Sequence, residues 1–319
     1  MLEEIVAGGE AEAQPALRVV RNKTKKMEKS SKWRLLTVDE VLNMPRPKWL
    51  IEGILKEGTL AVLYGEPKST KSFVALDWAA SLSEGDDWFD FTTPHPRDVV
   101  YVQAESPWGL GDRLKAWREA RGTKPERLRF LYHPINMLDA SDRESLVTLI
   151  REEAVNPGLI ILDTMARTFG GGDENSASDM GAFVRNADLL KEELGTAILV
   201  VHHPGRNVKR GPRGSTALYG ALDTMMLMEK KGKPERLADG TTVIHSVLTC
   251  QDQKDAPCFD PHILTLICRD SCVAVEVEQV KGKAPKPKAL DNRTKLLAAL
   301  TGDCTEFHDW MRLSGVPLY

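Results

Sequence analysis

Long apolar runs are missing from this 319-residue sequence. No stretch approaches the roughly 20 apolar residues that a membrane-spanning helix needs. The N-terminus, Met1-Leu2-Glu3-Glu4-Ile5, also lacks the basic and apolar blocks of a secretory signal. These absences argue against a membrane protein and against secretion, and we expect a cytoplasmic location.

Cysteine is scarce as well. The five cysteines are an odd number, and without a secretory signal they favour a reducing compartment and free thiols. Cys250, Cys258, Cys268 and Cys272 lie close together in the sequence but form no tight Cys-x-x-Cys pair. A zinc site is therefore disfavoured, and we interpret these cysteines as small apolar residues of a sheet.

Neither sign of charge dominates the chain. Its 43 Lys and Arg residues and 46 Asp and Glu residues give a formal net charge of −3. A hydrophobic fraction of 42% and a charged fraction of 28% are typical of a globular protein. Any contact with nucleic acid must therefore come from a local basic patch, because the overall charge does not favour it.

Composition divides the chain into regions. Residues 1–35 are polar and charged without sustained periodicity, which predicts a disordered N-terminal arm. Residues 36–280 form the main domain, and residues 281–290 are a Lys/Pro linker. Residues 291–319 are a short helical tail that resembles a truncated winged-helix domain.

Apolar segments of strand length alternate with helix-like segments in the main domain. The predicted strands are 60–64, 98–103, 128–132, 158–162 and 196–201, and the predicted helices are 71–83, 109–121, 142–155 and 178–194. This alternation predicts an α/β fold with a doubly wound, mostly parallel sheet flanked by helices. Further strand-like segments at 224–228, 242–248, 262–267 and 273–277 are joined by turns, and we expect them to extend the sheet as hairpins.

A phosphate-binding motif lies between the first predicted strand and the first long helix. The segment Gly65-Glu66-Pro67-Lys68-Ser69-Thr70-Lys71-Ser72 matches G-x-x-x-x-G-K-[ST], except that Thr70 stands where the second glycine is expected. In such a loop, backbone N–H groups and a helix N-terminus surround the phosphates. We therefore predict that this loop binds ATP, with Lys71 at the β- and γ-phosphates and Ser72 on Mg²⁺.

Other polar residues follow the predicted strands. Asp163 ends an apolar strand and is a second candidate ligand for Mg²⁺. Glu105, just beyond another strand, is a candidate to polarise the attacking water. His202 and His203 follow a third strand and are candidates for contact with the γ-phosphate. Each of these residues also has a purely structural interpretation, as a solvated residue at a strand end or as a core residue whose hydrogen bonds are satisfied.

The segment 205–215 is basic and rich in glycine. Its four cations are Arg206, Lys209, Arg210 and Arg213. Two roles compete for them: contact with nucleic-acid phosphates, or an arginine finger donated to the ATP of a neighbouring subunit. An exposed loop without a role is the remaining alternative.

Taken in order, these motifs resemble those of RecA-fold P-loop ATPases of the RepA-like hexameric replicative helicase group, found on plasmids, phages and mobile elements. The resemblance covers about residues 45–280. It rests on Trp49-Leu50-Ile51-Glu52-Gly53-Ile54-Leu55, Gly65–Ser72, Val99–Glu105, Ile160–Arg167, Gly171-Gly172-Asp173-Glu174-Asn175, Val200-Val201-His202-His203 and Arg213-Gly214-Ser215-Thr216-Ala217. It implies a RecA-like core whose sheet is extended by C-terminal hairpins.

The resemblance also implies roles for single residues. Lys71 and Ser72 match the Walker A pair and Asp163 the Walker B acid, while Glu105 matches the catalytic glutamate. His202 and His203 match the paired histidines that link the γ-phosphate to DNA-binding loops. Arg213 matches the arginine finger, and Lys254 resembles a further cation supplied across a subunit interface.

The function implied by the resemblance is an ATP- and Mg²⁺-dependent motor on single-stranded DNA. Its partners would be further copies of the chain in a ring, most simply a hexamer, and a primase or another replication protein. Thr70, and Asp252 at a position where related sequences often carry lysine, depart from the family pattern and point to slow hydrolysis or a regulatory role. Two alternatives stay open: a RecA-like recombination or repair ATPase, and a nucleotide-dependent binding module with little hydrolysis.

Overall fold

The computed structural model describes residues 34–104, 109–153, 155–205, 212, 216–238, 240–268 and, for the backbone, 272–279. The chain divides into a unit that ends at Arg46 and a second unit that begins at Pro47. In the first unit, helix α1 (Val38–Leu42) begins with a capping box between Thr37 and Glu40. The predicted Lys/Pro linker and helical tail, and nearly all of the predicted N-terminal arm, lie outside the described residues and stay predictions.

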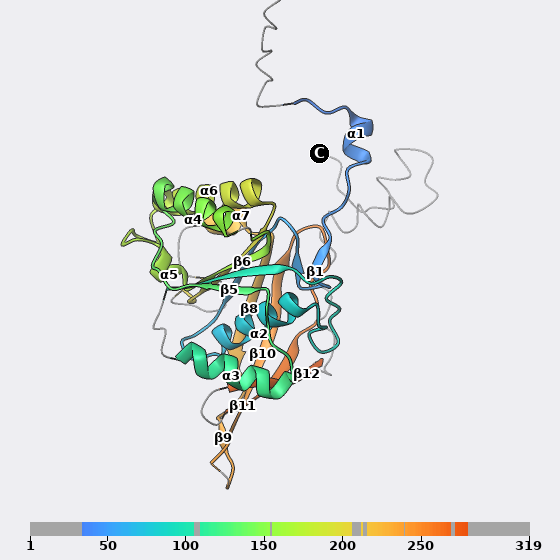
Figure 1. The fold of residues 1–319 in the computed structure, drawn as a ribbon, viewed down its shortest axis with the longest axis vertical. Helices are drawn as coiled ribbons and strands as arrows, with labels where there is room; N and C mark the ends of the chain where they lie inside the picture. The colour runs from blue at the N-terminus through green and yellow to red at the C-terminus, as the bar shows by residue number, and fades with distance from the viewer. Residues whose placement is uncertain are drawn as a thin grey trace, which may run out of the picture. The chain divides into compact units, whose positions relative to one another are not determined.

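A ten-stranded sheet forms the centre of the second unit, with the strand order β12-β11-β10-β8-β3-β7-β6-β4-β5 and β9 paired to β10 (Figure 1). Its strands are β3 (Leu60–Tyr64), β4 (Asp98–Gln103), β5 (Leu128–Leu131), β6 (Pro157–Asp163), β7 (Ala197–His202), β8 (Thr224–Lys230), β9 (Glu235–Arg236), β10 (Thr242–Gln253), β11 (His262–Cys268) and β12 (Cys272–Gln279). Strands β5, β4, β6, β7, β3 and β8 run parallel, whereas β10, β11 and β12 are antiparallel to their neighbours. The predicted fold class, a mostly parallel sheet extended by C-terminal hairpins, is confirmed.

Helices cover both faces of this sheet. Helices α2 (Lys71–Glu84) and α3 (Leu110–Arg121) lie on one face, and α4 (Ala140–Glu152), α5 (Met165–Thr168), α6 (Ala177–Leu194) and α7 (Thr216–Ala221) lie on the other (Figure 1). Two buried apolar clusters correspond to these faces, one built on α2 and the other on α6. A separate two-stranded sheet, β1 (Trp49–Ile51) with β2 (Leu55–Lys56), packs into the α2 cluster.

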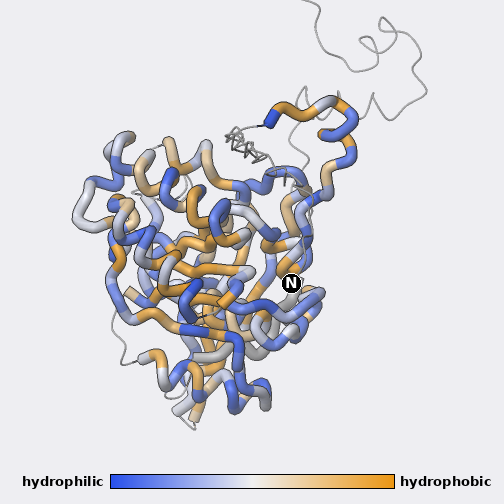
Figure 2. Tube along the Cα trace, turned by 45° about the horizontal axis from the view of Figure 1, so that its top comes forward, coloured by the Kyte–Doolittle hydropathy of each residue, from blue (hydrophilic) through white to orange (hydrophobic). Residues whose placement is uncertain are grey.

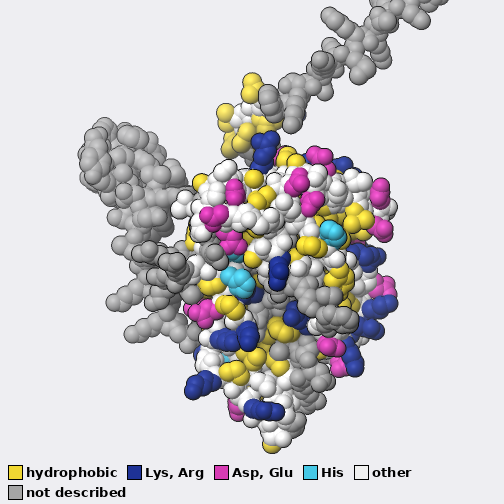
Figure 3. Space-filling view, turned by 90° about the vertical axis from the view of Figure 1, so that its left-hand side faces the viewer, with side chains coloured by type: hydrophobic (Ala, Val, Ile, Leu, Met, Phe, Trp, Pro, Cys, Tyr) yellow, Lys and Arg dark blue, Asp and Glu magenta, His cyan; other side chains and the backbone are white. Residues whose placement is uncertain are grey.

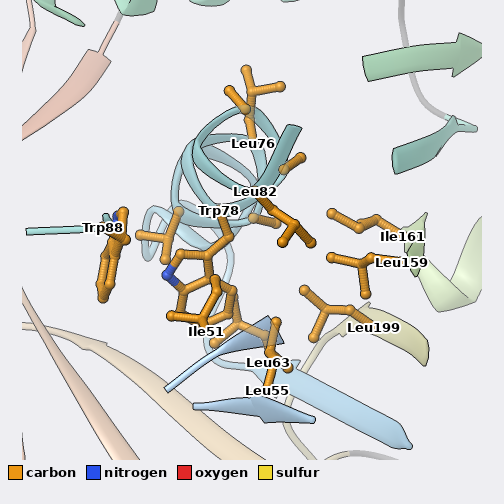
Figure 4. Packing of buried hydrophobic residues seen from close by; sticks show 14 of the residues in the cluster. Ile51, Leu55, Leu63, Leu76, Trp78, Leu82, Trp88, Leu159, Ile161 and Leu199 are labelled. Atoms are coloured by element: carbon orange, nitrogen blue, oxygen red, sulfur yellow. The ribbon is translucent and has the colours of Figure 1, made fainter. Parts of the chain in front are cut away.

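The parallel strands are apolar on both sides because each side is covered. Every residue of β3 and of β7 is buried, as expected for a sheet with helices on both faces. Side chains alternate along β3, so Leu63 joins the α2 cluster and Tyr64 joins the α6 cluster. In Figure 4, Trp78 and Leu82 of α2 point toward leucine and isoleucine side chains of the sheet. The hydropathy view likewise shows apolar segments running through the interior of the unit (Figure 2).

Two expectations differ in detail from the structure. Strand β10 continues to Gln253 rather than ending at residue 248, because a register shift near Cys250 lets its pairing with β8 continue. Cys250 and Cys258 are free thiols, but Cys268 is disulfide-bonded, so the expectation of free thiols is wrong at Cys268. Within the part of the chain that the structure describes, no helix combines the length and the apolar character that crossing a membrane requires.

Candidate functional site

The phosphate loop, Asp163 and the two histidines lie at one edge of the sheet because the parallel strands that carry them all end there. Tyr64, the last residue of β3, is in register with His202 at the end of β7. Strand β7 pairs with β6, whose last residue, Asp163, is in register with Gln103 at the end of β4. Neighbouring strands lie about 4.8 Å apart, so these ends form one continuous row. Glu105, two positions beyond Gln103, lies outside the described residues.

The phosphate-loop motif follows β3 at this edge, and its backbone carbonyl groups surround the side chain of Lys71. The ammonium Nζ of Lys71 donates to the carbonyl oxygens of Gly65 and Glu66, each at 2.8 Å, and the lysine is only 5% exposed. Gly65 packs against the backbone of β8: a Cβ atom added there would lie 2.1 Å from the carbonyl oxygen of Met228. The first glycine of the motif is therefore required by packing against β8.

The N-terminus of α2 points into this loop. Thr70 occupies the N-cap position in the left-handed conformation (φ 68°, ψ 8°), and its side chain makes no capping bond to the helix. The first N–H groups of a helix need acceptors from outside the helix, and the helix dipole favours an anion at that end. A buried cation beside a helix N-terminus that lacks a side-chain cap is an arrangement that binds phosphate, so the residues present fit a nucleotide.

A carboxylate faces the same side of the sheet as α2. Asp163 is completely buried, and its Oδ2 accepts a 2.6 Å hydrogen bond from the phenol of Tyr101 on β4. Ile161, two positions earlier on the same strand, belongs to the α2 cluster, so alternation places Asp163 on that side too. A carboxylate and the Ser72 hydroxyl in the first turn of α2 are oxygen donors of the kind that Mg²⁺ takes. The motifs did not reveal Tyr101, because its partner lies 62 residues away.

The two histidines differ in their surroundings. His202 is fully buried and in register with Tyr64, whose ring belongs to the α6 cluster, so its side chain lies on the face opposite α2. His203 is half-buried just beyond the strand end. Burial, with Tyr219 and Glu229 adding to it, raises the pKa of Tyr64 to about 12. Contact between the histidines and a γ-phosphate stays a prediction.

Helix α2 contains a buried acid, Asp77, that connects it to α3 and that the sequence did not reveal. Asp77 accepts hydrogen bonds from the indole nitrogens of Trp88 (2.6 Å) and Trp117 (2.7 Å), and Arg121 lies 3.3 Å away. Burial raises the pKa of Asp77, and the Arg121 charge and the indole donors partly offset this. These contacts tie α2 to α3 and so fix the direction in which the helix N-terminus points.

The basic segment 205–215 begins and returns at the same edge. Pro204 and Pro212 form an isolated antiparallel bridge, and the phenol of Tyr219 on α7 donates to the Pro212 carbonyl at 3.0 Å. The cations Arg206, Lys209, Arg210 and Arg213 lie outside the described residues. Figure 3 looks onto the edge where α5 lies, and on this face basic, acidic and histidine side chains are intermingled.

Lys254 lies far from the phosphate loop of its own chain. Its backbone N–H donates to the carbonyl of Asp223, whose own N–H donates to Leu60 at the beginning of β3. Its Nζ contacts the Gly220 carbonyl (3.3 Å) and the Asp223 carboxylate (3.5 Å). Lys254 is therefore at the edge where β3 begins, opposite the loop that follows the end of β3. A role for Lys254 at a nucleotide of another copy of the chain stays a prediction.

Comparison with known proteins identifies the family to which the chain belongs. A family model described as an AAA domain matches residues 28–208, which is more than half of the chain. No curated protein matches. Among solved structures, the crystal structure of a KaiC-like protein from the hyperthermophilic archaeon Pyrococcus horikoshii OT3 is similar at 12% identity and a TM-score of 0.47, covering 72% of this chain and 99% of that one. From the extent of the family match, the chain belongs to the AAA domain family and is a P-loop ATPase.

Proposed function

We propose that the protein is a replicative-helicase-like motor that hydrolyses ATP between subunits of a ring and acts on single-stranded DNA. The observation that carries the proposal is the common location of two features. The phosphate loop follows β3 and Pro204 follows β7, two strands that end at one edge of the sheet, and Pro212 is bridged to Pro204. Nucleotide state and DNA contact can then influence each other over a short distance.

The residues around the loop have different roles in binding the phosphates, the metal and the attacking water. Lys71 exchanges its contacts with the Gly65 and Glu66 carbonyls for phosphate oxygens, which are stronger partners for an ammonium. Ser72 and Asp163 hold Mg²⁺, which neutralises charge on the phosphates when it is bound. Tyr101 keeps the Asp163 carboxylate in a fixed orientation. Glu105, on the sequence motif alone, orients the attacking water.

The proposed ring is supported by two cations that we assign to the nucleotide of a neighbouring subunit. Lys254 lies at the opposite edge of the sheet from its own phosphate loop, so its proposed role needs a neighbouring subunit. Arg213, as an arginine finger, has the same requirement. A hexamer that recruits a primase or another replication protein is the assembly we propose, on the family resemblance of these residues.

The decisive test measures ATP turnover with and without single-stranded DNA, together with the mass of the protein in solution with ATP. We expect turnover stimulated by DNA and a mass of several chains. Lys71→Ala and Asp163→Asn should abolish the turnover. A protein that stays monomeric with ATP, and whose turnover ignores DNA, would refute the motor.

Two alternatives predict different outcomes of simple experiments. A recombination ATPase would form open filaments with ATP, which electron microscopy distinguishes from closed rings. A binding module would retain nucleotide without turnover, and Glu105→Gln would then change nothing measurable. Turnover that falls sharply in Glu105→Gln would instead support hydrolysis by the proposed route.

A further inference from the structure

The missing second glycine of the phosphate loop is matched by an unusual serine in the C-terminal part of the sheet. Thr70 adopts φ 68°, a region that glycine enters readily and that a β-branched residue strongly disfavours. Thr70 is also buried, at 5% exposure. Its conformation therefore needs contacts that hold it in place.

The Thr70 hydroxyl supplies such contacts. Its Oγ1 lies 2.6 Å from the Ser69 carbonyl oxygen and 2.9 Å from the Oγ of Ser246 on β10. A hydroxyl carries one proton, and the carbonyl oxygen can only accept. When the Thr70 proton goes to Ser69, the bond between the two hydroxyls uses the proton of Ser246. Both hydroxyl groups are then satisfied without solvent.

Ser246 stands at a position that is otherwise apolar. It is completely buried and shares its face of β10 with Leu248, which belongs to the α2 cluster. A buried hydroxyl in such a row is costly unless it is hydrogen-bonded, and Thr70 is the partner that the structure gives it. The pair joins residues 176 positions apart. The opposite end of the loop, Gly65, rests on β8 beside β10.

We propose that Ser246 is a positioning residue for the phosphate loop: its bond to Thr70 holds the left-handed backbone that glycine would otherwise provide. The antiparallel strands thereby become part of the nucleotide site, and the ligand whose binding they control is the phosphate chain of ATP. The inference rests on the proposed nucleotide binding, but not on motor activity or DNA.

A double-mutant cycle tests the pair. ATP affinity is measured by calorimetry for the wild type, Ser246→Ala, Thr70→Gly and the double variant. We expect Ser246→Ala to weaken ATP binding about 5- to 20-fold when Thr70 is present, and less than about 2-fold when residue 70 is glycine. Thr70→Ser, which keeps the hydroxyl, should retain the dependence on Ser246. Thr249→Ala, on the other face of β10, is the matched control and should leave affinity unchanged.

Hydrogen–deuterium exchange of residues 65–73 without nucleotide supplies a second measurement. Ser246→Ala should speed exchange of these amides in the Thr70 background and not in the Thr70→Gly background. Equal effects of Ser246→Ala in both backgrounds, on affinity and on exchange, would show that Ser246 only stabilises the fold and would overturn the inference. A wild type that binds no ATP would refute the proposed function, while the exchange measurement would still decide whether the pair holds the loop.

Discussion

The parallel and antiparallel regions of the sheet contribute to the site in different ways. In the parallel region (β5, β4, β6, β7, β3 and β8) every strand ends at the same edge, so the site residues at the ends of β3, β6 and β7 lie along that edge. In the antiparallel region (β10, β11 and β12) direction alternates, and the residue that reaches the site, Ser246, lies within a strand instead of after it. The comparison indicates a division into two groups of residues: those that contact the ligand, and those that hold the contacting residues in position. Four experiments test that division.

The largest effects should come from cavities, and they should be similar in the two regions. Leu199 of β7 and Leu264 of β11 are both completely buried in the α2 cluster. Replacing either by alanine should lower the free energy of unfolding by about 2–5 kcal/mol. Urea denaturation measures this, with Leu237→Ala, at a position 42% exposed, as a control expected to change it by about 0.5 kcal/mol or less. Two separate unfolding transitions would contradict a sheet that folds as one unit.

Removing the buried lysine should affect ligand and not fold. Lys71→Ala removes an ammonium that we expect to make two charge-assisted hydrogen bonds to phosphate, each contributing about 1.5–3 kcal/mol. ATP affinity should fall by about 100-fold or more. Calorimetric titration measures the loss, and Lys68→Ala, which changes an exposed lysine of the same loop, should cost far less. Equal losses in the two variants would mean that general positive charge, rather than the position of Lys71, binds the nucleotide.

An alkaline pH dependence should arise in the parallel region, at the end of β3. Tyr64 is 1% exposed, and burial is the main reason that its pKa is raised to about 12. The folded state therefore holds the phenolic proton more tightly than the unfolded chain, whose tyrosine pKa is about 10. Its stabilising contribution is complete below pH 10 and is lost as the pH rises toward 12. Between pH 9 and pH 11 the loss should be about 1.4 kcal/mol.

Tyr64→Phe should remove this part of the pH dependence. The comparison is between wild-type and variant unfolding free energies at pH 9 and pH 11, so that the contributions of other tyrosines cancel. An identical pH dependence in both proteins would mean that the Tyr64 proton does not contribute.

The smallest expected effect concerns metal affinity. Tyr101→Phe removes the phenol that donates to Asp163, and a typical hydrogen bond contributes about 1 kcal/mol net, which corresponds to about 5-fold in affinity. The Mg²⁺ concentration for half-maximal turnover should rise by several-fold, while ATP affinity without metal stays unchanged. Tyr132→Phe, at a position 51% exposed, is the matched control. A fall in affinity for metal-free ATP would place Tyr101 in the loop's support instead.

Much of the fold could be predicted because its signals are local. The apolar runs that became β3 and β7 were recognised within one residue at each end, and helix α6 begins at Ala177 where the pattern indicated residue 178. The one-turn helix α5 (Met165–Thr168) was not predicted, because four residues are too few to show the periodicity of a helix. Strands β1 and β2 escaped for the same reason: they are too short to alternate.

The site could be predicted only where a motif carries it. Lys71 and Asp163 were found because they stand at fixed places after apolar strands. Tyr101 and Ser246 were not, because each is identified by a partner 62 or 176 residues away, and hydrogen bonds at that distance leave no spacing in the sequence. Asp77 was hidden similarly, in the middle of a helix that the pattern did predict.

Gly65 has a consequence for how variation in related sequences should be read. A side chain there would collide with the Met228 carbonyl and push β8, the last parallel strand before the antiparallel region, away from β3. Overpacking of this kind destabilises the whole domain, whatever the protein binds. Selection for folding alone would therefore preserve this glycine in a descendant that had lost its ATPase activity. A glycine at this position in a homologue is therefore evidence of an intact sheet. Within the loop, it is the lysine that indicates a working nucleotide site.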